Sequence, residues 1–246
     1  MDAYQVCQEF KIFVESNMER YRAETFENKE PETLAWIRGY VKNADTFLDV
    51  GGNIGIYSLF LAGRYGKSFV LAFEPFLQNF LRLEENIQLN GFTNIRAFHA
   101  AFGASTRMEN FYSPKIEAGS SGGQIGKTID EHGKKFSFLS YEQVPVYRMD
   151  DFFHLFKIPV PRHIKIDVDG QEEQVLIGGM NVIGNYGCKS VLIERNPSLL
   201  KENLLRLMDY LGYTDDNEFN KMENHSRVRR EREGIKAENI IFTRKL

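Results

Sequence analysis

Cysteine is scarce in this chain, which contains only Cys7 and Cys188. Two cysteines are too few for a disulfide framework or for a zinc site built from thiolates. We therefore expect both to pack as small apolar side chains in a reducing compartment. The first five residues also lack the basic-then-apolar order of a secretion signal, so a cytoplasmic location is expected.

Long apolar runs and a large charge excess are missing as well. No segment approaches the roughly 20 consecutive apolar residues that cross a bilayer, so we expect no membrane span. The formal net charge of -3 gives no general attraction for nucleic acid. A basic run at residues 227–232 has an interleaved glutamate and no aromatic neighbour, which favours a solvated surface over an RNA site. No nucleic-acid partner is therefore expected.

Aromatic side chains, in contrast, are plentiful. The chain has 20 Phe and 11 Tyr among its 246 residues, and a hydrophobic fraction of 42%. That fraction is ordinary for a globular protein, so most of these rings are expected in a core. The length suits one sizeable domain.

The segment 1–44 is expected to form an N-terminal helical extension. In its first half, Val6, Phe10, Phe13 and Val14 recur at helical spacing. In its second half, Pro31 occupies a first-turn position of another helix. These helices could cover the active site, cap the sheet, or pair two copies of the chain as a homodimer.

From residue 45 to 246 the pattern predicts one α/β domain, because short apolar runs alternate with helical stretches. The expected strands are 46–49, 69–74, 95–102, 163–168 and 190–194, with a late strand at 240–242. This order favours a mostly parallel, doubly wound, Rossmann-like sheet with helices on both faces. An irregular insertion at 105–148, with a glycine- and serine-rich stretch at 119–123, is expected to be a lid or a loop near the cofactor.

A glycine-rich turn follows the first strand, with the sequence Asp49-Val50-Gly51-Gly52-Asn53-Ile54-Gly55. Glycine is needed where the backbone turns tightly near a ligand, and the next helix points its positive end at the same place. A nicotinamide dinucleotide requires glycines at the first, third and sixth positions of such a turn. Here they occupy the first, second and fifth, with Asn53 at the third.

The acid that precedes the turn also bears on the choice of cofactor. Asp49 would repel a pyrophosphate, yet it suits a cationic amino acid such as the methionine part of S-adenosylmethionine. A short-chain dehydrogenase would in addition need a Tyr-x-x-x-Lys pair, which is absent from this chain. The sequence therefore favours S-adenosylmethionine. A nicotinamide-dependent oxidoreductase and a non-catalytic adenosyl-binding module are the alternatives.

Acidic and amide side chains lie at the carboxyl ends of four of the five main predicted strands. They are Asp49, Glu74, Asp167 with Asp169, and Glu194 with Asn196. Such groups are costly beside buried strands unless they bind something, and ligands of open α/β sheets lie at these strand ends. Glu74 follows the turn at about the spacing of 20 residues that is typical of an acid binding ribose hydroxyls. It could instead cap the helix that starts near Phe76.

Four stretches resemble the motifs of FkbM-type S-adenosylmethionine-dependent methyltransferases, in the same order. The turn from Asp49 to Gly55, followed by Tyr57-Ser58, resembles their first motif. The other three stretches are Phe73-Glu74-Pro75 with Asn86 and Asn90, Met149-Asp150-Asp151-Phe152, and the block 164–172 with Leu176 and Gly178-Gly179. Gly52 replaces the commoner alanine, and Asp169 replaces the commoner glutamate.

This resemblance implies a class I methyltransferase fold and methylation of a hydroxyl oxygen, with S-adenosylmethionine as cofactor. The acceptor would be a small molecule or glycan: a sugar, a glycan precursor or a natural product. By the same resemblance, Asp49, Gly51, Gly52, Asn53 and Gly55 would hold the methionine end, and Glu74 the ribose. The backbone at Ala101 and Phe102 would flank adenine, and Ser120, Ser121 and Gly122 would close over the cofactor.

Asp167 is the best candidate for the general base, because it ends the fourth strand beside the expected methyl position. A purely structural bond to a loop is its alternative role. His99 and His163 are weaker candidates, because one lies within a strand and the other opens one.

Two further hypotheses concern charged residues at the strand ends. Asp167, Glu194 and Asn196 could together hold a divalent metal such as Mg²⁺, an analogy that we rank below a metal-free site. Arg195 could contact an anionic substrate.

Overall fold

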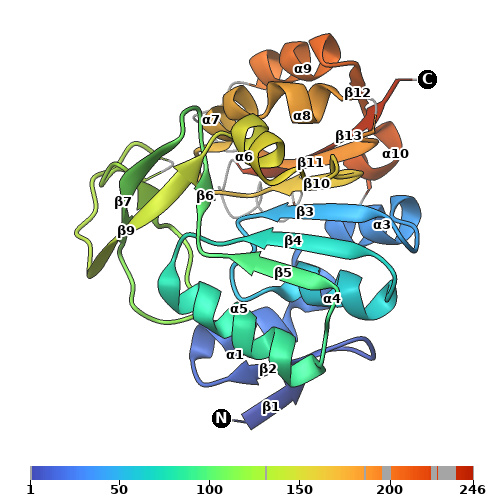
Figure 1. Cartoon of the computed structure of the whole chain (residues 1–246). Coiled ribbons are helices and arrows are strands. Elements are labelled where there is room, and N and C mark those ends of the chain that lie inside the picture. The colour runs from blue at the N-terminus through green and yellow to red at the C-terminus, as the bar shows by residue number, and fades with distance from the viewer. Residues whose placement is uncertain are drawn as a thin grey trace.

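The structure is a computed structural model that describes residues 2–130, 132–185, 187–195, 201–222, 226 and 237–245. Its centre is a seven-stranded sheet with the order β12-β13-β11-β10-β3-β4-β5 (Figure 1). The strands are β3 (Thr46–Val50), β4 (Phe69–Phe73), β5 (Ile95–Phe98), β10 (His163–Ile166), β11 (Ser190–Arg195), β12 (Tyr213–Asp215) and β13 (Glu238–Arg244). The five strands from β11 to β5 are parallel, and only β12 and β13 add antiparallel pairs. The predicted mostly parallel sheet is confirmed.

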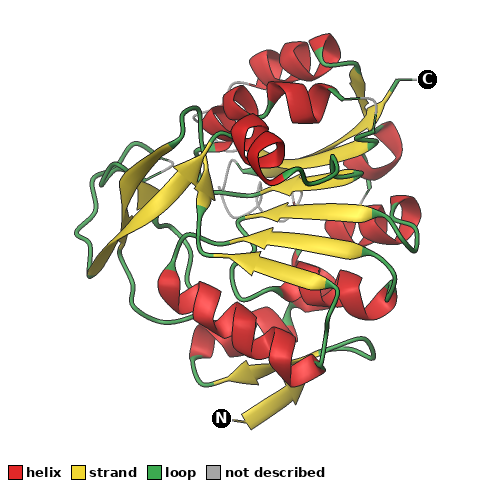
Figure 2. Ribbon diagram, viewed as in Figure 1, coloured by secondary structure: helices red, strands yellow, loops and turns green. Residues whose placement is uncertain are grey.

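Helices cover both faces of this sheet, as Figure 2 shows. One face carries α3 (Pro31–Tyr40), α4 (Ile56–Arg64), α5 (Leu77–Asn90) and α10 (Asn217–Asn220); the other carries α6 (Met149–Phe156), α7 (Glu172–Gly178), α8 (Met180–Gly184) and α9 (Lys201–Tyr210). Side chains alternate between the two cores with the period of a strand. In β3, Phe47 packs on the first face, whereas Leu48 and Val50 pack on the second.

The N-terminal segment differs from the helical prediction in its first half. Residues 2–14 form an antiparallel hairpin of β1 (Asp2–Gln5) and β2 (Lys11–Val14), and helices follow only as α1 (Asn17–Glu24), α2 (Phe26–Lys29) and α3. The helical interpretation was wrong because Phe10, Ile12 and Val14 are buried with a period of two. Two asparagine side chains of α5 accept from the β2 backbone, Asn90 from the Lys11 N–H at 2.9 Å and Asn86 from the Phe13 N–H at 2.8 Å.

The insertion at 105–148 is more regular than predicted. The expected strand at 95–102 breaks after Phe98, and its end becomes β6 (Ala101–Phe102) of a second sheet. That sheet has the order β6-β9-β7-β8, with β7 (Arg107–Ser113), β8 (Gln124–Ile125) and β9 (Ser140–Tyr147). Phe111 of β7 and Val144 and Val146 of β9 form the small core of this sheet, because the apolar side chains of these strands are buried on one face. It stands beside the carboxyl ends of the parallel strands (Figure 1).

Asn196 and the basic run at 227–232 lie outside the described residues. Cys188 is buried as expected and Cys7 is half-buried, and both are free thiols. Among the described helices, none has the length and apolar character that crossing a membrane requires.

Candidate functional site

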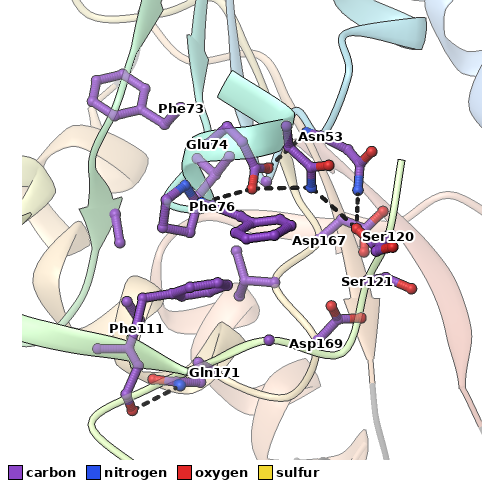
Figure 3. A pocket seen from close by; sticks show the side chains of 18 of the residues that line it. Asn53, Phe73, Glu74, Phe76, Phe111, Ser120, Ser121, Asp167, Asp169 and Gln171 are labelled. Carbon is purple, nitrogen blue, oxygen red and sulfur yellow. Dashed lines mark hydrogen bonds between the residues drawn. The ribbon is translucent and has the colours of Figure 1, made fainter. Parts of the chain in front are cut away.

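A pocket opens at the carboxyl ends of β3 and β10, where the strand order reverses. Ligands of open α/β sheets bind at such a switch point. The predicted site residues that line it are Gly51, Asn53, Glu74, Ala101, Phe102, Ser120, Ser121, Asp167, Asp169 and Glu194. Figure 3 labels six of them, which come from the glycine turn, the ends of the strands and the loop of the second sheet: Asn53, Glu74, Asp167, Asp169, Ser120 and Ser121. The fold therefore brings together residues that lie far apart in the sequence.

Two glycines of the turn are required by their surroundings. Gly51 has a φ of +85°, and a Cβ there would overlap the backbone carbonyl oxygen of Asp167. Gly55 has a φ of +92°, and a Cβ there would collide with Leu83 of α5. At Gly52 the nearest atom to a Cβ would be 3.5 Å away, which is ordinary contact, so this position does not demand glycine. Gly52 and Gly55 do not line the pocket themselves.

Every backbone N–H group of residues 51–55 already has an acceptor within the protein. Those of Gly51 and Gly52 both donate to the Phe73 carbonyl at 2.9 Å, and that of Asn53 to Glu74 at 2.8 Å. Those of Ile54 and Gly55 donate to the Asn53 side chain and to the Gly52 carbonyl, each at 2.9 Å. A pyrophosphate-binding turn needs such groups to be free. This part of the turn therefore does not fit a pyrophosphate.

Asp49 lies beneath the turn and does not line the pocket. Its side chain is buried, accepts a hydrogen bond from the Ser58 hydroxyl at 2.7 Å, and sits on β3 opposite Lys165 of β10. Burial raises the pKa of Asp49, against the opposing effect of the Lys165 ammonium. Its contribution to the site is thus to the shape and charge of the turn, and a direct contact with a cofactor stays a prediction.

Glu74 combines the two roles that the sequence left open. One carboxylate oxygen accepts from the Asn53 N–H, and the other accepts from the N–H of Phe76, the N-cap of α5, at 3.0 Å. The side chain is buried yet lines the pocket. Burial raises its pKa to about 7, although the backbone donors lower it. Glu74 therefore joins the turn to α5 and still faces the site where a ligand would lie.

The loop between β7 and β8 closes one side of the pocket. The Ser120 carbonyl accepts from the side-chain amides of Asn53 at 2.7 Å and Asn79 at 3.0 Å. Asn79 also accepts from the Gly119 N–H at 2.8 Å. The Ser120 hydroxyl is buried and, within the part of the chain that the structure describes, has no hydrogen-bond partner. An orphaned polar atom in a pocket wall is a group that a ligand could satisfy.

A second closing contact comes from the loop after β10. Asp169 adopts a left-handed backbone with a φ of +53°, which is uncommon outside glycine. Its carboxylate accepts from the Gly122 N–H at 2.7 Å, and its carbonyl accepts from the Gln124 side chain at 2.6 Å. The strand-end loop and the insertion are thus held together around the pocket.

Asp167 lies where the sequence predicted, directly after β10 and on the pocket wall. One of its carboxylate oxygens accepts from the buried Lys165 ammonium at 2.7 Å. Burial by itself would raise the pKa of Asp167, but the Lys165 charge, a hydrogen bond with Glu194 and the Lys29 charge together lower it, and the net pKa is below the ordinary value. Asp167 is therefore held as a carboxylate at neutral pH.

Two aromatic pocket residues were missed by the sequence reasoning. Phe76 and Phe111 both line the pocket, with ring centroids 5.8 Å apart and planes 26° apart (Figure 3). Phe76 could have been noticed, because it follows Glu74-Pro75 directly. Phe111 could not, because it belongs to the second sheet. Such apolar faces suit a planar heterocycle.

The other candidate side chains do not line the pocket. His163 is the first residue of β10, at the end of the strand away from the pocket. It contacts Ser190 and Asp45 there, and burial lowers its pKa to about 4. His99 sits between β5 and β6 against the Pro75 carbonyl. Arg195 pairs with Glu238 of β13 at 2.9 Å, so the structure does not place it toward a substrate.

The predicted metal ligands come together only in part. Asp167 and Glu194 share the pocket, whereas Asn196 lies outside the described residues. Within the described ranges, no group of three His, Cys, Asp or Glu side chains is arranged to hold a metal. A metal-free site stays a prediction, with the divalent metal as its lower-ranked alternative.

A buried acid in the loop after β10 predicts how stability varies with pH. Glu172 accepts from the Gly170 N–H at 3.1 Å, and burial raises its pKa from 4.5 to about 7. The folded state then keeps a proton that the unfolded chain releases, so the contribution of Glu172 to stability is full at acidic pH and is lost as pH rises through 7. The stability difference between Glu172→Gln and the wild type should therefore change with pH. We expect the free energy of unfolding of the variant, relative to that of the wild type, to rise by on the order of 2–3 kcal/mol from pH 5 to pH 8.

Denaturant unfolding at several pH values measures this difference. Glu173→Gln is the matched control, because Glu173 is the exposed neighbour on the same helix and should show no such trend. A gain that is equal at both pH values would mean that Glu172 does not titrate in this range.

Comparisons with known proteins agree with this architecture. The family model described as the methyltransferase FkbM domain matches residues 49–225. Methyltransferase 1 of Beauveria bassiana is 32% identical over 149 residues, which are 54% of this chain and only 58% of that relative. Among solved structures, a candidate rRNA methylase of Clostridium thermocellum superposes with a TM-score of 0.50 at 10% identity, over 89% of this chain and 97% of that one.

A second solved structure, a SAM-dependent methyltransferase of Aquifex aeolicus, has a TM-score of 0.46 at 12% identity, over 83% of this chain and 91% of that one. The family match carries the assignment, since it covers well over half of the chain and includes the glycine turn, the strand ends and the second sheet. The fold is that of the class I methyltransferases, and the chain belongs to the FkbM methyltransferase domain family.

Proposed function

We propose that this chain transfers a methyl group from S-adenosylmethionine to a hydroxyl oxygen of a sugar, a glycan precursor or a natural product. The observation that carries the proposal is the pocket itself, in which Asn53, Glu74 and Asp167 face one cavity at the switch point of the sheet. The membership of the methyltransferase family supports it. The hydroxyl acceptor rests on the resemblance of the motifs alone.

The residues of the pocket fit this cofactor. Asn53, with the Gly51 turn, would hold the methionine part, and Glu74 would accept hydrogen bonds from the ribose hydroxyls. Ala101 and Phe102 would flank the adenine, where the Phe76 ring adds an apolar face. The orphaned Ser120 hydroxyl, with Ser121 beside it, offers a polar contact from the closing loop.

The chemistry needs two things from the protein, an aligned acceptor and a place for its proton. When bound, S-adenosylmethionine supplies a methyl group that its positive sulfur activates. Asp167 is the side chain in position to accept the proton that the acceptor hydroxyl loses. The Lys165 ammonium at 2.7 Å keeps Asp167 ionised, so the base is ready at neutral pH. The pocket walls fix the distance and direction of approach.

Calorimetric titration separates this proposal from its alternatives. We expect S-adenosylhomocysteine to bind and NAD⁺ not to bind, because the N–H groups of residues 51–55 are already used. An assay of methyl transfer to a panel of sugars and glycosides then tests whether the chain methylates hydroxyl groups of this class. Tight NAD⁺ binding without a response to S-adenosylhomocysteine would refute the proposal, whereas binding without transfer to any acceptor would favour an adenosyl-binding module.

The ribose role of Glu74 makes a separate prediction. We expect Glu74→Ala to weaken S-adenosylhomocysteine binding by about 1–3 kcal/mol, because hydrogen bonds to the ribose are lost. Calorimetry measures the affinity, and a melting curve shows whether the variant is folded. Glu74→Gln keeps an acceptor oxygen for only one of the Asn53 and Phe76 N–H groups, and Glu117→Ala removes an exposed acid of the nearby loop as a control. An unchanged affinity would leave Glu74 only its capping role.

A further inference from the structure

The N-terminal segment contributes to the pocket, although it lies outside the family match at 49–225. Helix α1 packs on the loop between β7 and β8: the Ser16 hydroxyl donates to the Ala118 carbonyl at 3.1 Å, and the Arg22 guanidinium donates through Nε to the Gly119 carbonyl at 2.6 Å. Arg22 and Lys29 both line the pocket. Two cations therefore reach the site from a part of the chain that carries none of the family motifs.

The charges around the pocket are unequal. Its lining acids are Glu74, Asp167, Asp169 and Glu194, and Arg22 and Lys29 are the only cationic side chains among the described residues that line it. Arg22 makes no ion pair with a carboxylate elsewhere in the described ranges. Lys29 pairs with the buried Glu30 at 3.0 Å. Arg22 thus presents a guanidinium whose terminal N–H groups are available to an anion.

Contacts through neighbouring residues connect Arg22 and Lys29 to the glycine turn at one end of the pocket. The Gly119 carbonyl accepts from Arg22, and the next carbonyl, that of Ser120, accepts from Asn53 of the glycine turn. On the other side, Glu30 joins Lys29 to the Tyr57 hydroxyl in the first turn of α4, at 3.0 Å. Arg22 and Lys29 therefore lie next to the turn that would hold the methionine part of the cofactor.

The turn itself cannot serve an anion through residues 51–55, because each of their N–H groups already donates within the protein. The methionine part carries a carboxylate as well as an ammonium. The acids of the pocket suit the ammonium, and the carboxylate needs a cation. A guanidinium held in place by its own Nε–H bond is well suited to this, because its remaining N–H groups match the two oxygens of a carboxylate.

We propose that Arg22 and Lys29 form a binding site for the carboxylate of the methionine part of S-adenosylmethionine. The proposal rests on the proposed function, since it assigns one end of the same cofactor. It makes the N-terminal segment a part of the cofactor site, and Arg22 the principal anchor because Lys29 is shared with Glu30.

The test compares two probes that differ only in the carboxylate. S-adenosylhomocysteine contains it, and decarboxylated S-adenosylhomocysteine keeps the ammonium but lacks it. Calorimetry on the full chain should show that Arg22→Gln weakens binding of the first probe by roughly 10- to 100-fold, and that the double variant with Lys29→Gln weakens it further. The second probe should bind Arg22→Gln and the wild type within about threefold, which also shows that the variant pocket is intact.

Matched variants distinguish this role from a purely structural one. Arg20→Gln removes the same charge from α1 at an exposed position outside the pocket, and should leave both affinities unchanged. Arg22→Lys should restore part of the preference for the carboxylate. An equal loss for both probes would show that Arg22 only holds the loop, and an unchanged affinity for S-adenosylhomocysteine would likewise overturn the proposal. If the wild type binds neither probe, the proposed function itself fails.

Discussion

Replacing Asp167 with asparagine is expected to slow methyl transfer by roughly 10²- to 10⁴-fold while S-adenosylhomocysteine still binds. Asparagine has nearly the same shape and can still accept a hydrogen bond from Lys165, so the pocket should keep its form. What it loses is the ability to take a proton from the acceptor hydroxyl. Steady-state rates are measured with an acceptor that the wild type methylates, and calorimetry measures the affinity for S-adenosylhomocysteine. Together they separate loss of the base from loss of cofactor binding.

The environment of Asp167 also predicts the pH dependence of the wild-type rate. Lys165 holds the pKa of Asp167 below its ordinary value, so this carboxylate remains ionised throughout the neutral range. We therefore expect no loss of rate near pH 7 that is attributable to Asp167. Asp151→Asn, the same substitution at a half-buried position of α6 outside the pocket, should have the wild-type rate. If Asp167→Asn costs less than about tenfold, Asp167 orients the site and another group takes the proton.

The largest expected effect on stability comes from Gly51→Ala. The left-handed backbone at φ +85° costs a residue with a Cβ about 1–2 kcal/mol, and forcing that atom into the Asp167 carbonyl adds about 1–3 kcal/mol. We expect a loss of about 2–5 kcal/mol in the free energy of unfolding, which is a large part of the stability of an ordinary domain. Because the obstacle is backbone, no side-chain rotation relieves it, and the loop after β10 must move.

Denaturant unfolding measures this loss, and calorimetry on the folded fraction shows whether the cofactor site survives. Gly66→Ala is the matched control, because a Cβ at Gly66 would have no other atom within 4 Å and the backbone there has no left-handed φ. That substitution should be neutral or stabilising by less than about 1 kcal/mol. A stability of Gly51→Ala equal to that of Gly66→Ala would mean that the close approach of β3 and β10 is not required.

The two incorrect predictions, for the N-terminal segment and for the insertion at 105–148, have the same physical cause. Both segments are stabilised by distant parts of the chain. The hairpin at 2–14 depends on Asn86 and Asn90 of α5, whose side chains bind the β2 backbone across more than 70 positions. The second sheet depends on β7 pairing with β9 across a long loop. Apolar spacing within a short window cannot reveal such pairings, so a half-buried strand was mistaken for a helix.

Sequence alone determined the features that depend on local chemistry: the parallel sheet, the glycine turn after β3, and acids at the strand ends. Buried strands, left-handed glycines and carboxylates beside apolar runs each leave a signature in a few neighbouring residues. Only the tertiary structure decided that residues 51–55 have no free N–H group, and that Arg22 meets Gly119 although they are 97 positions apart. Those facts depend on which surfaces pack together, and packing between distant segments is set by the whole core and not by any local pattern.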